Sequence, residues 1–162
     1  MARFPVFIEM GDRKVTVIGA GTVATRRILV LLEYGARITV IAPKASDEIT
    51  ALSKKGALNL LEEPYGDDDG PRRGAQLKII GESGLVISAT DSPACDLLVH
   101  EDCRRLGIPV NIASDRSLCD FYFPGTARGA GVTAAVITDK ADHHLAAKAA
   151  HEIQRLLKEL ED

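Results

Sequence analysis

A short segment near the start of the chain, VTVIGAGTVATRR at residues 15–27, constrains the fold more than any other part of the sequence. Small residues here follow a run of branched apolar side chains and come directly before a helical pattern. Gly19, Gly21 and Ala24 match the G-x-G-x-x-G/A spacing. The first glycine permits a tight turn, the second leaves room for a pyrophosphate, and the alanine lets a helix pack closely against a strand. The segment therefore predicts a dinucleotide-binding turn between a strand and a helix.

Apolar runs rich in β-branched residues recur along the chain and alternate with helical patterns. Apolar residues at helical spacing fill the segments 24–32 and 95–106, and Gly35 and Gly107 follow them as stop signals. Strands that read as almost continuous apolar runs belong to a sheet covered on both faces. The alternation therefore predicts an α/β fold with a doubly wound parallel sheet, a Rossmann-like architecture. The five runs expected to form its strands are 14–19, 37–42, 57–63, 84–90 and 108–113.

Two segments depart from this alternation. Residues 64–76 (PYGDDDGPRRGAQ) combine charges with glycine and proline, which predicts an exposed loop. After residue 120, the pattern predicts two short strands around a glycine-rich turn, followed by a long helix. This helix carries an apolar stripe that packs either on its own sheet or on a partner chain, and the pattern leaves both open. The stripe comprises Leu145, Ala149, Ile153, Leu156, Leu157 and Leu160.

Composition excludes several classes of protein. A chain of 162 residues with 46% hydrophobic content is long enough for one packed core. Its net charge of −3 comes with no basic stripe, which argues against nucleic acid as a partner. The longest aliphatic run, residues 28–32, is far too short to span a membrane, and no secretory signal opens the chain. Three cysteines without a C-x-x-C pair predict neither a disulfide framework nor a zinc site. We therefore expect a cytoplasmic protein.

The end of the second expected strand bears on the choice of cofactor. It reads Ala42-Pro43-Lys44 and lacks the acidic residue that usually binds the adenosine ribose hydroxyls. Lys44 could pair with a 2′-phosphate, but a lysine at the end of a strand is also commonly a solvated charge. The residues alone leave NAD and NADP open.

Histidines raise the question of a metal site. His143 and His144 are adjacent and therefore point to different faces of the expected helix. His144 and His151 share a face but lie two turns apart, whereas metal-binding histidines on a helix are typically one turn apart. No metal ligand is therefore assigned.

Four segments resemble the precorrin-2 dehydrogenase family, the dehydrogenase module of sirohaem synthesis, some of whose members are also sirohydrochlorin ferrochelatases. They are similar to the family's opening with its glycine-rich turn, its second strand, its A-A-T-D-D turn and its N-V-x-D-x-x-x-x-C-D-F-x-F-P motif. The last motif is the most specific, because other Rossmann proteins have no reason to share it. The segments are FPVFIEMGDRKVTVIGAGTVATRR (4–27), ITVIAP (38–43), LVISATDSP (85–93) and VNIASDRSLCDFYFPG (110–125).

The resemblance implies an organisation and a reaction. It implies an NAD-binding domain over residues 1–113 and a dimerisation region over residues 114–162, with the chain forming a homodimer. It also implies oxidation of precorrin-2, a reduced tetrapyrrole with eight carboxylates, to sirohydrochlorin, with NAD⁺ as the hydride acceptor. Chelation of iron or cobalt is left open. The alternative is a non-catalytic sensor or carrier that binds NAD(H) or a tetrapyrrole, and an activity assay separates the two.

The resemblance further implies which residues contact the cofactor. The residues of the glycine-rich turn, of the segment after the second strand and of the Ala89-Thr90-Asp91 turn lie at the carboxyl ends of expected strands, where a doubly wound fold binds its ligands. Thr90 and Asp91 could equally cap the helix that begins near Pro93. The expected cofactor-binding residues are Gly19, Gly21, Thr22, Val23, Ala24, Pro43, Lys44, Thr90, Asp91 and Asn111.

The expected catalytic residues lie after the fifth strand. The family's important aspartate falls on Ser114 in this chain, and Asp115 comes one residue later. A carboxylate near the nicotinamide suits the reaction, because loss of a hydride must be accompanied by loss of a proton. We expect Asp115 to be the working carboxylate. A direct substitution by Ser114, and an essential role for neither residue, remain the alternatives.

Overall fold

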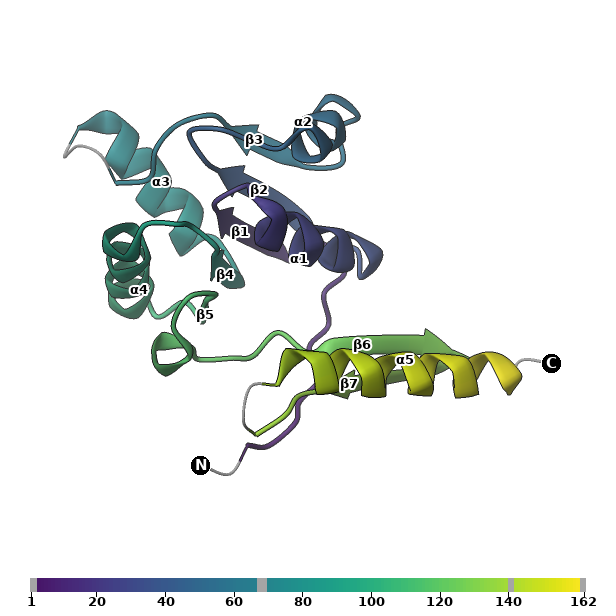
Figure 1. The fold of residues 1–162 in the computed structure, drawn as a ribbon. Helices are drawn as coiled ribbons and strands as arrows, with labels where there is room; N and C mark the ends of the chain where they lie inside the picture. Colours follow the sequence, from purple (N-terminus) through teal and green to yellow (C-terminus); the bar gives the residue numbers. More distant parts are fainter. Residues whose placement is uncertain (1–2, 67–69, 140–141, 161–162) are drawn as a thin grey trace. The chain divides into compact units, whose positions relative to one another are not determined.

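The computed structural model describes residues 3–66, 70–139 and 142–160 (Figure 1). The chain divides into two compact units, Met1–Phe121 and Tyr122–Asp162. The first unit continues past the last strand of the large sheet because the chain folds back on that strand. The backbone N–H of Asp120 donates to the carbonyl of Val110, at 2.9 Å, and the Asn111 side chain donates to the carbonyl of Phe121, at 2.7 Å.

The first unit is built on a five-stranded sheet with the order β3-β2-β1-β4-β5, and all four strand pairs are parallel. Lys14 pairs with Arg37, and Val15 pairs with both Ile38 and Leu85. The order reverses between β1 and β4, which is the switch point of a doubly wound fold. The predicted fold class is confirmed. The strands are β1 (Lys14–Ile18), β2 (Arg37–Ile41), β3 (Asn59–Leu61), β4 (Leu85–Ser88) and β5 (Val110–Ile112).

Helices cover both faces of this sheet, which explains the continuous apolar runs of the strands. α1 lies on one side, whereas α3 and α4 lie together on the other (Figure 1). All four residues of β4 are buried, and in β1 only Lys14 is exposed. The helices of this unit are α1 (Thr22–Glu33), α2 (Asp47–Lys54), α3 (Pro71–Gly81) and α4 (Pro93–Leu106), with a short 3₁₀ turn η1 at Arg116–Leu118.

The glycines expected to stop α1 and α4 do so in the left-handed conformation. Gly35 has φ +76° and Gly107 has φ +70°, and each directly follows the last turn of its helix. Glycine adopts this conformation at low cost because it has no Cβ. Both stops predicted from the sequence are confirmed.

The predicted exposed loop at 64–76 is wrong in its second part. α3 begins at Pro71, where a proline fits because the first helical N–H has no acceptor within the helix. Tyr65 and Gln76 are also buried rather than exposed. Residues 67–69 lie outside the described part of the chain. The breaker-rich composition therefore marks the start of a helix, not a continuous loop.

The second unit consists of an antiparallel hairpin and a helix. β6 (Gly125–Gly129) pairs with β7 (Val132–Val136) through a tight turn in which Ala130 and Gly131 both have positive φ. This geometry matches the right-handed twist of a hairpin. The two strands, the turn and the following helix α5 (His143–Glu159) confirm the pattern expected after residue 120.

α5 packs on this hairpin with only part of its apolar stripe. A Cβ added at Gly125 would lie 3.2 Å from both the Ala146 carbonyl oxygen and the Ala150 Cβ, so helix and strand are in close contact. Ala146, Ala150 and Leu157 are buried, whereas Leu145 and Leu156 are more than half exposed. Of the stripe residues, Leu157 is buried and Ala149 and Ile153 are half-buried, so packing on its own sheet describes only these three. Ala146 and Ala150 lie outside the expected stripe and complete the contact with the hairpin. Within the described ranges, no helix has both the length and the apolar composition needed to cross a membrane.

Candidate functional site

The glycine-rich turn after β1 is pressed against the end of β4. Gly19 has φ +99°, and a Cβ at this position would overlap the carbonyl oxygen of Ala89 and lie 3.2 Å from the Thr90 nitrogen. The backbone of Ala89 also donates to the Ile18 carbonyl at 2.8 Å. Gly19 is therefore required by the close approach of two strand ends at the switch point of the sheet.

Gly21 has a different role, because the protein itself does not need a glycine there. Its φ of −83° suits any residue, and a Cβ would meet no atom within 4 Å. Gly21 caps α1 without a side-chain hydrogen bond to the helix amides, whereas Ser46 and Ser92 cap α2 and α4 through their hydroxyls. A helix start without a side-chain cap, next to a position with free space, is suited to binding an anion. This geometry fits the pyrophosphate of a dinucleotide.

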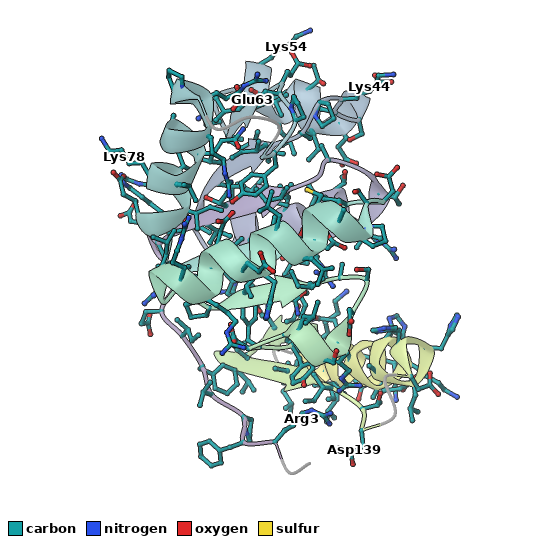
Figure 2. The ribbon with its side chains drawn as sticks, turned by 90° about the vertical axis from the view of Figure 1, so that its left-hand side faces the viewer. Arg3, Lys44, Lys54, Glu63, Lys78 and Asp139 are labelled. Carbon is teal, nitrogen blue, oxygen red and sulfur yellow. The ribbon has the colours of Figure 1, made fainter. Side chains whose placement is uncertain are left out.

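The first turn of α1 and the end of β2 border the same space. Thr22 and Val23 are exposed, and Ala24 is fully buried against the sheet. The loop after β2 is held to the glycine-rich turn, since the Ser46 N–H donates to the Ala20 carbonyl at 3.2 Å. Pro43 and Lys44 in this loop are exposed, and Figure 2 shows the Lys44 side chain pointing outward from the first unit.

A buried carboxylate, that of Asp96 on α4, joins the ends of β4 and β5. Asp96 is 3% exposed and accepts hydrogen bonds from three hydroxyls, those of Ser88 at 2.6 Å, Thr90 at 2.7 Å and Ser114 at 2.5 Å. No motif in the sequence marks Asp96 as a site residue. Its spacing could have indicated burial. Asp96 comes three residues before Val99, and Val99 comes four residues before Cys103, so all three lie on the inward face of the helix.

Thr90 and Asp91 do not form the cap of α4. The cap is Ser92, whose hydroxyl accepts from the Cys95 N–H at 3.3 Å. The Thr90 hydroxyl instead donates to Asp96, and Asp91 is exposed beside it. Both residues therefore lie in the turn after β4, next to the glycine-rich turn.

Ser114 and Asp115 are adjacent but differ in their partners. Ser114 is exposed and donates its hydroxyl hydrogen to the buried Asp96. The Asp115 carboxylate caps η1, accepting from the Ser117 N–H at 2.8 Å and from its hydroxyl at 2.6 Å. These hydrogen bonds lower the pKa of Asp115 below its ordinary value. A lowered pKa makes this carboxylate a weaker proton acceptor.

Asn111 lies within β5, and its buried side chain makes three hydrogen bonds. Its Oδ1 accepts from Arg27 of α1 at 2.6 Å, and its Nδ2 donates to the Phe121 carbonyl and to the Cys119 sulfur. Burial lowers the pKa of Arg27 and raises that of Cys119. Asn111 thereby joins α1 to the segment that follows β5, while its predicted contact with a cofactor stays a prediction.

The expected site residues therefore fall into two groups. The glycine-rich turn, the loop after β2, the turn after β4 and Ser114 all follow carboxyl ends of parallel strands, where this fold binds its ligands. Asn111 and Asp115 lie close to this edge but hold the structure around β5 together. Among the residues that the structure describes, no three His, Cys, Asp or Glu side chains gather in a geometry that could hold a metal ion.

Comparisons with known proteins support this picture. Residues 6–125 match the family model described as "Putative NAD(P)-binding". The chain is 33% identical over 150 residues to the "Probable multifunctional siroheme biosynthesis protein HemA" of Ruminiclostridium josui, covering 93% of this chain and 27% of that protein. It is 38% identical over 124 residues to the siroheme synthase of Psychrobacter cryohalolentis, covering 76% and 22%. The chain thus spans about a quarter of the length of these curated relatives.

A solved structure of similar fold is that of "SirC, precorrin-2 dehydrogenase". It matches with a TM-score of 0.68 and 28% sequence identity, covering 95% of this chain and 71% of that one. The family model covers more than half of the chain and includes the whole parallel sheet. The chain therefore belongs to this NAD(P)-binding family, and its predicted membership of the precorrin-2 dehydrogenase family is confirmed.

Proposed function

We propose that this chain is an NAD⁺-dependent dehydrogenase that oxidises precorrin-2 to sirohydrochlorin. The observation that carries the proposal is the edge of the sheet at the switch point. There the glycine-rich turn before α1 lies against Thr90 at Gly19, and Gly21 in the same turn has open space around its Cα. Thr90 is joined to Ser114 through the Asp96 carboxylate. A dinucleotide site beside a group that can accept a proton is what this reaction requires. The relatives named for siroheme synthesis and precorrin-2 dehydrogenation support the substrate class.

In this proposal the chain's own residues hold and orient the two reactants. The first amides of α1, at Thr22 and Val23, bind the pyrophosphate, and Gly21 leaves room for it. Thr90 and Asp91 border the nicotinamide end, and Pro43 and Lys44 border the adenosine end. Bound NAD⁺ supplies the hydride acceptor. Ser114 faces the substrate, with Asp115 as the alternative proton acceptor that the sequence favoured.

The proposal is tested by mixing the purified protein anaerobically with precorrin-2 and either NAD⁺ or NADP⁺. We expect NADH absorbance to rise together with the sirohydrochlorin spectrum, and the rate with NADP⁺ to be lower. A parallel sample with Co²⁺ tests for chelation as an additional activity. If NAD⁺ binds and no sirohydrochlorin forms, the dehydrogenase proposal is overturned and a binding or carrier role takes its place.

We also propose that the chain forms a homodimer through its second unit. The outer leucines of α5 support this, because Leu145, Leu156 and Leu160 are 54%, 52% and 65% exposed. Leu156 lies about three turns after Leu145, and Leu160 about one turn further, so the three form one stripe along the helix.

A further inference from the structure

Asp96 occupies an unusual position for a carboxylate. Its side chain lies on the inward face of α4, next to the sheet, and three short hydroxyl hydrogen bonds converge on it. Each hydroxyl donates its hydrogen to a carboxylate oxygen, so the three groups together hold the Asp96 side chain in one orientation. Asp96 lies in the first turn of α4, directly after the turn that follows β4.

The two oxygens of Asp96 are used unequally. Oδ1 accepts from both Ser88 and Thr90, whereas Ser114 is the hydrogen-bond donor on Oδ2. Each carboxylate oxygen can accept two hydrogen bonds, so Oδ2 is the less saturated of the pair. Ser114 is exposed, and its only hydroxyl hydrogen is directed at this oxygen. The lone pairs of the Ser114 hydroxyl are therefore available to a proton donor on the solvent side.

We propose that Asp96, acting through Ser114, is the final acceptor of the proton that the substrate releases during oxidation. Ser114 is the group that touches the substrate, and Asp96 is a positioning residue behind it. A serine hydroxyl alone is a weak base at neutral pH, and a carboxylate hydrogen-bonded to it makes proton uptake possible. The inference rests on the proposed dehydrogenase function and extends it to the residues that move the proton.

The location of the pair supports the same role. Thr90 shares the Asp96 carboxylate with Ser114, and the backbone of Thr90 lies against the glycine-rich turn at Gly19. A single carboxylate thus connects the turn that borders the cofactor with the hydroxyl that faces the substrate. The neighbouring Asp115 has no such connection, because its carboxylate is held by Ser117.

The proton transfer balances with the overall oxidation. The reduced tetrapyrrole loses two hydrogens, one as a hydride that reduces the bound NAD⁺ to NADH and the other as a proton. The bond that releases the proton breaks, and its electron pair stays in the ring as part of a new double bond. The Ser114 Oγ takes up the proton while it passes its own hydrogen to Asp96 Oδ2. The resulting carboxylic acid returns the proton to water after product release.

The test uses the full chain and two single variants, Ser114→Ala and Asp96→Asn. Removing a general base typically lowers a rate 10²- to 10⁴-fold, so we expect kcat to fall by at least about 100-fold in both variants. The dissociation constant for NAD⁺, measured by calorimetry, is expected to stay within about threefold of that of the unsubstituted protein. Ser114→Ala removes only one exposed hydroxyl, so it keeps the test valid even if Asp96→Asn fails to fold.

A rescue and a matched control separate proton transfer from structural support. The double variant Asp96→Asn/Ser114→Asp returns a carboxylate to the exposed position, and we expect it to regain at least about tenfold in kcat over Asp96→Asn. Asp102→Asn removes another buried carboxylate of the same helix, one bonded to Tyr65 and Arg73. This control is expected to melt at a lower temperature but to keep kcat within about threefold.

The possible results distinguish a failure of the proton-transfer inference from a failure of the dehydrogenase proposal. If the folded single variants bind NAD⁺ and turn over at the rate of the unsubstituted protein, the inference is overturned while the dehydrogenase proposal stands. A loss of activity in Asp96→Asn but not in Ser114→Ala assigns Asp96 a structural role and also overturns it. If the unsubstituted protein binds NAD⁺ without turnover, the proposed function fails, and this inference fails with it.

Discussion

The two glycines of the turn after β1 show how one motif contains residues kept for different physical reasons. Gly19 serves the fold, because its positive φ and its contact with Ala89 exclude any side chain. Gly21 has an ordinary backbone conformation and open space around it, so the fold would tolerate a side chain. The motif alone does not distinguish these reasons, whereas the structure does.

A pair of alanine substitutions separates the two roles. We expect Gly19→Ala to lower the free energy of unfolding by more than about 2 kcal/mol, from backbone strain and overlap with Ala89. We expect Gly21→Ala to keep its stability within about 1 kcal/mol. Its added methyl group enters the space for the pyrophosphate, so the dissociation constant for NAD⁺ should rise at least about tenfold. Denaturant unfolding and calorimetric titration of both variants check this, and normal NAD⁺ affinity in Gly21→Ala would contradict the assigned site.

Site residues were predictable from the sequence where a glycine pattern or a strand end marked them. The turn at Gly19 and Gly21 and the segment ending at Thr90 both lie at the expected edge of the sheet. Asp96 was not predictable in this way, because a carboxylate on a helix is ordinarily solvated. Its burial depends on three hydroxyls brought from two strand ends, and only the folded chain places them together.

At the scale of elements, α3 and α4 are joined by a polar network rather than by apolar contacts alone. The buried Asp102 carboxylate of α4 accepts from the Tyr65 hydroxyl at 2.7 Å, forms an ion pair with Arg73 of α3, and is 3.1 Å from Arg105. Arg73 also lies over the Tyr65 ring, 5.0 Å from its centroid. Burial and the hydrogen bond to Asp102 raise the pKa of Tyr65 above its ordinary value, so this hydroxyl stays protonated as a donor.

Polar packing explains why residues 71–76, the first half of α3, were expected to form a loop. The sequence before and within it is charged and rich in glycine and proline, and its buried residues are Gln76 and Ile80. Gln76 donates to Glu63 and to the Pro64 carbonyl and accepts from the Gly66 N–H, so a polar side chain takes the place of an apolar one. Periodicity of apolar residues could not reveal a helix held in this way. The short α2 lacked a clear signal for a different reason, because it buries one residue, Ile49.

The network yields a stability prediction for Asp102→Asn. The substitution leaves the Arg73 guanidinium and the Tyr65 hydroxyl without a charged partner in a mostly buried setting. Removing one partner of such a pair costs about 3 kcal/mol, so the free energy of unfolding should fall by about that amount. Chemical denaturation monitored by circular dichroism measures it. Glu101→Gln, on an exposed position of the same helix, is the control and should remain within about 0.5 kcal/mol. An unchanged Asp102→Asn would show that the network does not join the two helices.

At the scale of the whole molecule, the chain contains a cofactor-binding unit and a smaller unit with an incompletely covered helix. In the second unit the hairpin buries Ala146, Ala150 and Leu157 of α5. The outer leucines lie on an adjacent face of the helix, and burying a leucine side chain contributes about 2 kcal/mol. The sequence predicted the stripe as one face, but in the structure Leu145, Leu156 and Leu160 of this stripe stay more than half exposed. The uncovered half is the part that a second copy of the chain would bury.

Leu156→Arg tests whether this stripe holds a dimer together. A charged side chain at the centre of an apolar interface is left without a partner, so we expect a dimer to become a monomer in multi-angle light scattering. Ala147→Arg is the matched control. Ala147 is exposed and, viewed down the helix axis, lies on the side opposite Leu156, so this substitution should leave the dimer intact. The inner residues of α5 are untouched in both variants, so the hairpin keeps its packing. A monomeric unsubstituted protein, or a Leu156→Arg variant that stays dimeric, would show that α5 does not form the dimer contact. NAD⁺ affinity should be the same in all three proteins if the first unit forms the cofactor site by itself.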